Sequence, residues 1–136
     1  MNIQPYLRYE ESEILPLYEA VGWISYVRHP KMLEDAFANS LCILGAYEED
    51  KLVGLIRCVG DGHSILFIQD LLVYPEYQRK GIGTALMRAV LERYAHVYQI
   101  QLTTDNTEKT KAFYRAQGFR SLEEIGCCTF MKNGKM

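Results

Sequence analysis

The chain has 136 residues, of which 49% are hydrophobic and 24% charged, with a formal net charge of −2 at pH 7. This length and composition fit one compact α/β domain, so we expect a single domain over residues 1–136. The slightly acidic balance, with Lys and Arg scattered along the chain, argues against a nucleic-acid-binding surface. No apolar run is long enough to cross a membrane, and the first residues lack the pattern of a secretion signal. A cytoplasmic location is therefore expected.

The four cysteines, Cys42, Cys58, Cys127 and Cys128, lack the Cys-x-x-Cys spacing of a zinc site, and the chain has only three histidines. We therefore predict no metal site. Because free cysteines are among the most buried residue types, we expect all four to be reduced and mostly in the core.

The first half of the chain alternates short elements. A strand is expected over residues 3–9, followed by a helix over 13–21 that begins near Ser12 and ends near Gly22. Pro30 opens a second short helix over residues 31–38. Three antiparallel strands follow, over residues 41–47, 51–59 and 64–73.

The second half begins with a helix over residues 81–94, whose apolar side chains recur at helical spacing. The next strand, over residues 97–103, is expected to run parallel to the strand before that helix. A helix over residues 107–117 ends at Gly118. Strands over 119–123 and 127–132 close the predicted sheet.

The junction between the strand ending near Val73 and the helix that follows carries the most specific pattern. Gly81 and Gly83 lack Cβ atoms where a backbone must approach a ligand, and the start of the helix offers unpaired N–H groups. Arg79 and Lys80 add positive charge. This arrangement is suited to bind a pyrophosphate.

Two common phosphate-binding motifs do not fit this junction. A dinucleotide fingerprint would require a third glycine where Leu86 stands. A Walker loop would require Gly-Lys-Ser/Thr, whereas Lys80 precedes both glycines. Neither motif therefore explains the pattern.

The sequence Gln78-Arg79-Lys80-Gly81-Ile82-Gly83 resembles motif A of the GNAT superfamily, the GCN5-related N-acetyltransferases. In that family the loop amides bind the pyrophosphate of acetyl-CoA. The resemblance implies that acetyl-CoA is contacted by a run of loop residues, Gln78, Arg79, Lys80, Gly81, Ile82, Gly83 and Thr84. It also implies that Leu71, Leu72 and Val73 lie beside the pantetheine and the thioester.

The order of the expected elements resembles the GNAT order over nearly the whole chain. The resemblance implies a GNAT fold of the α/β class, with a mixed sheet of six to seven strands flanked by about four helices. Strands 4 and 5 of that sheet would be parallel and splayed apart at their carboxyl ends. The pantetheine arm would occupy the gap between them.

A second motif, Ala112-Phe113-Tyr114-Arg115-Ala116-Gln117-Gly118-Phe119, resembles the segment on the last helix of this family. The resemblance implies that Phe113 and Tyr114 contact the cofactor, and that Tyr114 protonates the departing thiolate. A phenol can supply that proton without bringing charge into an apolar cleft. The alternative is that Tyr114 packs between a helix and the sheet.

The family often has Asn seven residues before this tyrosine, where the present chain has Thr107 preceded by Asn106. A contact of Asn106 or Thr107 with the cofactor is one hypothesis. The other is that Thr107, with Thr110 one turn on, caps the helix.

An amine attacks the thioester only when it is neutral, so a base must take its proton. Asp70 is the best candidate for this base because it lies near the predicted position of the thioester. The alternative is an ion pair between Asp70 and a cation such as Arg57. The resemblance implies that the acceptor pocket is formed by the first two helices, their connecting loop and the turn between the last two strands. This region offers Tyr18, Trp23 and Tyr26, with Arg28 and His29 nearby. Burial in the core is the alternative for those aromatic rings.

The resemblance implies an acetyl-CoA-dependent N-acetyltransferase that transfers the acetyl group to a primary amine of a small molecule or peptide, by direct attack in a ternary complex. The alternatives are a non-catalytic acyl-CoA-binding regulatory module, and a toxin-like acetyltransferase acting on aminoacyl-tRNA. The acidic balance disfavours the latter. A homodimer is plausible because edge strands near residues 127–132 need covering.

Overall fold

The structure is a computed structural model that describes residues 1–134. The chain forms two compact units, the first over Met1–Leu102 and the second beginning at Thr103. The first unit contains β1 (Asn2–Pro5), α1 (Glu11–Ala20), α2 (Ile24–Val27), α3 (Pro30–Ala38), β2 (Cys42–Glu48), β3 (Lys51–Gly60), β4 (Ile65–Val73), the 3₁₀ helix η1 (Pro75–Tyr77), α4 (Ile82–Arg93) and β5 (Gln99–Leu102).

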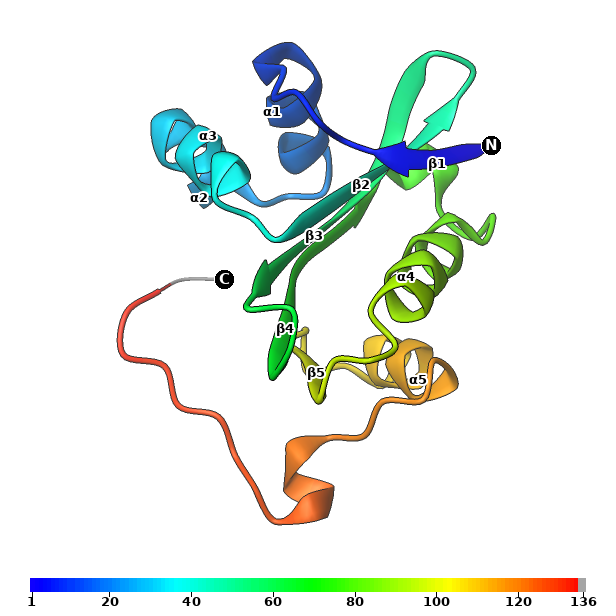
Figure 1. Cartoon of the computed structure of the whole chain (residues 1–136). Coiled ribbons are helices and arrows are strands. Elements are labelled where there is room, and N and C mark those ends of the chain that lie inside the picture. Colours follow the sequence, from blue (N-terminus) through cyan, green and yellow to red (C-terminus); the bar gives the residue numbers. More distant parts are fainter. Residues whose placement is uncertain (135–136) are drawn as a thin grey trace. The chain divides into compact units, whose positions relative to one another are not determined.

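The first unit is built on a five-stranded sheet in the order β1-β2-β3-β4-β5. Neighbouring strands are antiparallel from β1 to β4, and β5 is parallel to β4. Helices α1 to α3 lie on one face of the sheet and α4 on the other (Figure 1). The parallel pair follows from the crossover through α4, as the sequence predicted.

Three details of the first unit differ from the sequence prediction. Strand β1 ends at Pro5 instead of continuing to residue 9, and Tyr6 instead sends its side chain into the core. Helix α1 begins at Glu11, so Ser12 lies inside its first turn and is not its cap. Helix α2 was missed because four residues are too few to show helical periodicity.

The second unit contains α5 (Glu108–Ala116) and the 3₁₀ helix η2 (Leu122–Ile125). The prediction of strands over 119–123 and 127–132 is wrong, because the former range runs into η2 and residues 127–134 form neither strand nor helix. The Ser121 side chain accepts the N–H of Glu123 and so favours a local turn at that point. The sheet therefore has five strands rather than six or seven.

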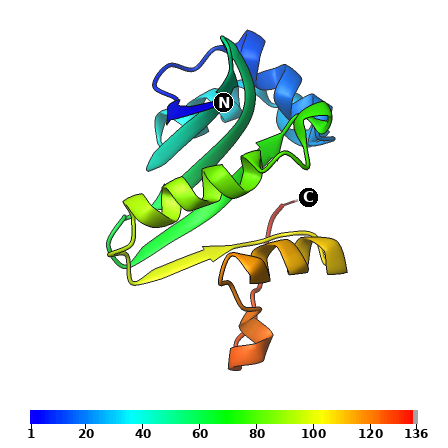
Figure 2. The same cartoon turned by 90° about the vertical axis from the view of Figure 1, so that its right-hand side faces the viewer.

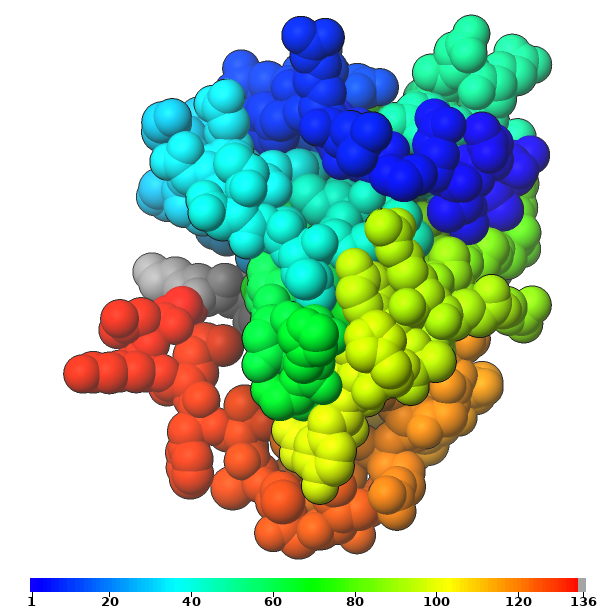
Figure 3. All heavy atoms as spheres, in the orientation of Figure 1, coloured from blue at the N-terminus to red at the C-terminus, as the bar shows by residue number. Residues whose placement is uncertain are grey.

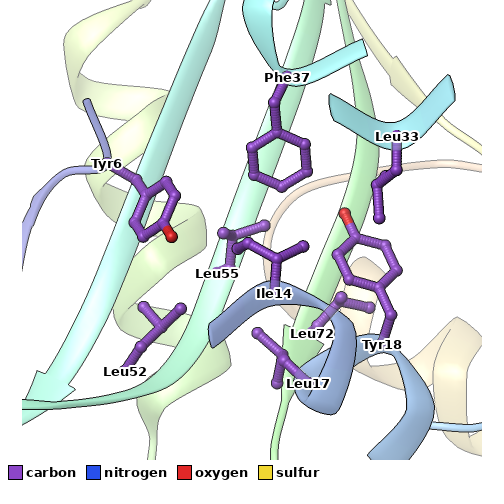
Figure 4. Packing of buried hydrophobic residues seen from close by; sticks show 9 residues of the cluster. All are labelled: Tyr6, Ile14, Leu17, Tyr18, Leu33, Phe37, Leu52, Leu55 and Leu72. Carbon is purple, nitrogen blue, oxygen red and sulfur yellow. The ribbon is translucent and has the colours of Figure 1, made fainter. Parts of the chain in front are cut away.

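The main core of the first unit lies between the sheet and helices α1 to α3. Figure 4 shows its nine buried side chains, which are Tyr6, Ile14, Leu17, Tyr18, Leu33, Phe37, Leu52, Leu55 and Leu72. Tyr18 is fully buried and packs edge-to-face against Tyr26 at 5.3 Å between ring centroids. For Tyr18, the core interpretation is therefore confirmed.

A β-bulge in β4 decides which of its side chains enter this core. Arg57 pairs with Asp70, but the next residue of β3, Cys58, pairs with Ile68, so Gln69 is an extra residue in β4. Neighbouring residues of a strand point to opposite faces, and paired residues share a face. The bulge therefore turns Asp70 toward α1 to α3 and leaves Ile68 on the face that α4 covers.

The cysteines divide into two pairs. Cys42 and Cys58 are buried and lie opposite each other on β2 and β3, and burial raises the pKa of Cys58 to about 12. Cys127 and Cys128 are exposed, so the expectation of mostly buried thiols is wrong for them. They lie in the segment that forms no strand, where nothing covers them among the described residues.

Over residues 1–134 no group of three His, Cys, Asp or Glu side chains could hold a metal ion, and none of the helices is long and apolar enough to span a membrane.

The turn before β4 gives a testable pH dependence of stability. The Asp61 carboxylate accepts hydrogen bonds from the Ser64 hydroxyl and from the amides of His63, Ser64 and Ile65, which lower its pKa from the ordinary value. A lowered pKa in the folded state stabilises the protein above the unfolded-state pKa, and that stabilisation is lost as the pH falls through the folded-state value. We expect Asp61→Asn to destabilise the protein more at pH 7 than at pH 2.5, as urea unfolding would measure. An equal effect at both pH values would contradict the assignment.

Candidate functional site

The loop between β4 and α4 is held against the end of β4 by a side chain of the motif. The side-chain amide of Gln78 donates a hydrogen bond to the backbone carbonyl oxygen of Val73 at 3.0 Å. Between them, Pro75–Tyr77 form one 3₁₀ turn. Gln78 therefore closes the loop onto the strand, which is a structural role in addition to the predicted cofactor contact.

Two residues of the loop have left-handed backbone conformations. Gly81, with φ +81°, is the N-cap of α4, and Arg79 has φ +65°. Glycine adopts this conformation without cost, whereas arginine is strained there by on the order of 1 kcal/mol. In turns with such residues, successive backbone amides can point to one side, which is an arrangement that binds anions.

The start of α4 has free hydrogen-bond donors. Among residues 1–134, the amides from Lys80 to Thr84 have no acceptor, and the first amide of the helix to find one is that of Ala85, which donates to Gly81 at 3.0 Å. The positive end of the helix dipole adds to these donors. Ile82 is buried, so its contribution to a ligand would come from its N–H.

A glycine in β3 allows the start of α4 to sit close to the sheet. A Cβ at Gly54 would lie 3.0 Å from the carbonyl oxygen of Leu72 and 3.2 Å from Cγ2 of Ile82. Any larger residue would therefore push the start of the helix away from β4. The position of the donors depends on this close packing.

The two parallel strands separate toward their carboxyl ends. Strand β5 pairs with β4 only from Ile65 to Ile68, and Leu102 is its last paired residue. Residues 69–73 of β4 extend beyond this pairing, and Figure 2 shows the two strands diverging. The splayed arrangement is therefore confirmed. Leu71 and Val73 are half-buried along this stretch, whereas the Leu72 side chain points into the core, so only its backbone could contact a ligand there.

Asp70 lies in a buried hydrogen-bonded cluster. Its Oδ2 accepts hydrogen bonds from the Tyr18 hydroxyl at 2.6 Å and from Nε of Arg57 at 2.7 Å, while Oδ1 has no partner among residues 1–134. Arg57 also donates to the Ser40 hydroxyl at 3.2 Å. Burial, and then the Asp70 charge, raise the pKa of Tyr18 well above its ordinary value, so Tyr18 remains a donor. The ion pair with Arg57 that sequence reasoning left as the alternative is present.

Part of the predicted acceptor region forms an aromatic surface next to the bulge. The rings of Trp23 and Tyr26 stack at 5.9 Å between centroids and are half-buried. Gln69, the extra residue of β4, donates from its side-chain amide to the Tyr26 hydroxyl at 3.3 Å. Arg28 and His29 are exposed at the end of α2.

The remaining predicted residues belong to the second unit. The Thr107 hydroxyl accepts the N–H of Thr110 at 3.2 Å, which confirms its role as the cap of α5, and Asn106 is exposed. Tyr114 packs against Phe113 at 5.0 Å and against Phe119 at 6.1 Å between ring centroids. Burial raises the pKa of Tyr114, although its hydrogen bond with the Thr104 side chain acts in the opposite direction.

Sequence reasoning missed a group of side chains next to the loop. The Nζ of Lys51 lies 5.0 Å from the ring centroid of Tyr74 and 5.5 Å from that of Tyr77, and Nζ of Lys80 lies 5.3 Å from Tyr77. Tyr77 is adjacent to the motif, but no sequence signal connects Lys51 with it. The pairing of β3 with β4 brings Lys51 to this position.

A parallel strand pair that splays beside a glycine loop at the start of a helix is the arrangement that the resemblance to the GNAT superfamily implies. The profile described as the acetyltransferase (GNAT) family matches residues 7–119, and the chain belongs to that family.

Relatives and solved structures agree with this assignment. An uncharacterized ycf52-like N-acetyltransferase from Prochlorococcus marinus is 30% identical over 125 residues, covering 87% of this chain and 67% of the relative. The ycf52 N-acetyltransferase from Gracilaria tenuistipitata var. liui is 32% identical over 110 residues, covering 76% of this chain and 58% of the relative. The chain thus spans about three fifths to two thirds of the lengths of these relatives.

Among solved structures, a GNAT family acetyltransferase from Streptococcus pneumoniae is 42% identical with a TM-score of 0.89, covering 99% of this chain and 98% of that one. The PaiA N-acetyltransferase from Thermoplasma acidophilum, solved in complex with coenzyme A, has a TM-score of 0.71 at 18% identity, covering 88% and 91% of the two chains. At that identity the likeness shows the fold alone.

Proposed function

We propose that this chain transfers the acetyl group of acetyl-CoA to a primary amine of a small molecule or peptide. The observation that carries the proposal is the row of amides from Lys80 to Thr84, which have no acceptor in the described part of the chain and stand at the positive end of α4. Such a row binds phosphate oxygens. The family to which the chain belongs supplies the reaction class.

The proposed cofactor contacts follow the order of the chain. The amides from Lys80 to Thr84 bind the pyrophosphate, with the guanidinium of Arg79 adding charge, while Gln78, whose backbone N–H already donates to Pro75, contributes through its side chain. The backbone of Leu71, Leu72 and Val73, which extends beyond the pairing with β5, binds the pantetheine. From the second unit, Asn106, Thr107, Phe113 and Tyr114 are proposed cofactor contacts.

In the proposed reaction, the lone pair of a neutral amine attacks the thioester carbonyl and the C–S bond breaks. The amide product loses one proton and the departing sulfur gains one. Tyr114 donates a proton to the sulfur, because its raised pKa keeps it protonated at neutral pH. No covalent intermediate on the enzyme is required.

Asp70 is the proposed acceptor of the proton from the amine. The unpartnered Oδ1 supports the proposal, because it leaves a lone pair free. The ion pair with Arg57 opposes it, because the Asp70 carboxylate already serves as the counter-charge of a buried guanidinium. Loss of activity alone cannot separate a base role from a structural role in the ion pair, so the dependence of kcat on pH must be measured as well.

The acceptor amine is proposed to bind near the aromatic surface of Trp23 and Tyr26, beside Gln69. Stacked rings attract a cation through their π faces, and Gln69 offers an amide for orientation. This placement is adjacent to Asp70 along β4.

The first test compares thermal unfolding with acetyl-CoA, CoA, ATP and NADPH. A ligand at about 100 times its Kd stabilises the folded state by about 2.7 kcal/mol. We expect both CoA species to raise the Tm of the protein, and Gly81→Ala to reduce the shift because alanine disfavours the left-handed cap. A shift with ATP or NADPH alone would overturn the proposal.

Turnover separates an enzyme from a regulatory module. With acetyl-CoA bound, thiol release should accelerate with at least one member of a panel of primary amines and peptides. Binding of CoA without thiol release for any member would favour the acyl-CoA-binding module. Release only with aminoacyl-tRNA would favour the toxin-like reaction.

A further inference from the structure

The side chains of Lys51, Tyr77 and Lys80 form a group beside the loop. The ammonium groups of Lys51 and Lys80 lie 5.5 and 5.3 Å from the same Tyr77 ring centroid, and Lys51 also lies over Tyr74. Contacts of this kind hold an ammonium group by its attraction to the π face. Tyr77 therefore contacts two positively charged side chains.

These charges come from two distant parts of the sequence. Lys51 begins β3 at the end of the β2–β3 hairpin, which projects from the surface in Figure 3. Lys80 lies in the loop, directly before the N-cap of α4. The fold brings the hairpin to the loop, because the start of β3 lies alongside the end of β4.

No carboxylate lies within ion-pair distance of the ammonium groups in the described part of the chain, although Glu49, Asp50 and Glu76 are their neighbours in the sequence. Neither Lys51 nor Lys80 forms an ion pair with a carboxylate over residues 1–134, and neither does Arg79, which precedes Lys80. Glu48, which pairs with Lys51 across the hairpin, instead lies 3.8 Å from the N-terminal ammonium group. Like charges held close together repel, so a bound anion would stabilise the group.

We propose that Lys51 and Lys80, positioned by Tyr77, bind the 3′-phosphate of CoA. The inference rests on the proposed function, which brings CoA to the adjacent loop. CoA carries a 3′-phosphate in addition to its pyrophosphate. The amides of Lys80 to Thr84 match a pyrophosphate, whereas ammonium groups match an exposed phosphate as point charges.

The loop amides and the two lysines then bind different parts of CoA. The loop amides bind a feature that CoA shares with dephospho-CoA. Lys51 and Lys80 recognise the one group that distinguishes the two molecules. The Tyr77 ring lowers the rotamer freedom of both lysines before binding, which reduces the entropy lost when the phosphate binds.

Calorimetric titration of the full chain with CoA and dephospho-CoA tests the assignment. The variants are Lys51→Met and Lys80→Met, which keep an apolar stem of similar length and remove the charge. Lys31→Met is the control, because Lys31 is an exposed lysine on α3 that pairs with Asp35 at 3.2 Å. All three residues are exposed, so the variants should fold.

We expect the unaltered protein to bind CoA roughly tenfold more tightly than dephospho-CoA, since two charge-assisted contacts are involved. Lys51→Met and Lys80→Met should each weaken CoA binding by about three- to fivefold, leave dephospho-CoA binding unchanged, and reduce the dependence of CoA binding on salt. Lys31→Met should change neither ligand.

Two outcomes would overturn the assignment while leaving the proposed function intact. One is equal affinity of the unaltered protein for CoA and dephospho-CoA. The other is an equal loss for both ligands in the lysine variants, which would indicate a contact with the pyrophosphate or a change in the loop. Absence of binding of either ligand to the unaltered protein would instead overturn the proposed function, and this assignment with it.

Discussion

Replacing Tyr114 with Phe is expected to lower kcat for acetyl transfer by about 10²- to 10⁴-fold, the range typical for loss of a positioned general acid. The half-buried phenol has a raised pKa, so it holds its proton at neutral pH and can give it to the departing thiolate. Phenylalanine keeps the packing against Phe113 and Phe119 and removes only the hydroxyl. Steady-state assays of thiol release at saturating acetyl-CoA measure the effect.

The pH profile gives a second measurement on Tyr114. The reaction requires the protonated phenol, so the Tyr114-dependent part of kcat should persist through neutral pH and be lost only above the ordinary tyrosine pKa of about 10. Tyr98→Phe, at an 84% exposed position beside β5, is the matched control and should leave kcat unchanged. A Tyr114→Phe variant with normal kcat would show that this tyrosine only packs.

Asp70→Asn is expected to destabilise the protein by about 3–5 kcal/mol, because it leaves the buried Arg57 guanidinium without its counter-charge. Asp70 is 1% and Arg57 4% exposed, so water cannot replace the lost partner. Urea unfolding measures the loss. A change below about 1 kcal/mol would show that Arg57 finds another acceptor.

Tyr18→Phe provides the graded comparison for this cluster. It removes one hydrogen bond to Asp70 and leaves the ion pair intact, so a smaller loss of about 1.5–3 kcal/mol is expected. The proposed base role of Asp70 needs a separate measurement, which is the dependence of kcat on pH for Asp70→Asn at a temperature where this variant remains folded. An unchanged rate and pH profile in that variant would dismiss the base role and leave Asp70 as a structural residue.

The glycine loop and the strand order could be predicted because their signals are local. Gly81 precedes a periodic apolar helix, and its left-handed φ is a conformation that favours glycine over other residues. The conformation of residues 119–132 could not be predicted. Their apolar residues suggest strands, but this segment pairs with no strand in the described chain. At η2, the hydrogen bond of Ser121 decides the conformation within a few residues.

The sequence also left two alternatives open at Asp70 and at Thr107. The structure shows the ion pair for Asp70 and the helix cap for Thr107. Aspartate and threonine both suit a functional or a structural role, and the residues that surround each of them in space decide between the two roles. For Asp70 the deciding neighbour is 13 residues away, and it is brought opposite by the register of β3 and β4.

The sequence by itself determined the glycine loop, the crossover helix and the family, because each depends on residue types at short, fixed spacing. Only the tertiary structure decided that Gln69 is the extra residue of a bulge, that Asp70 consequently faces Arg57 and Tyr18, and that Lys51 and Lys80 both contact Tyr77. These contacts depend on strand register and on which face of the sheet a side chain occupies. A shift of one residue reverses that face, and no local pattern in the sequence encodes it.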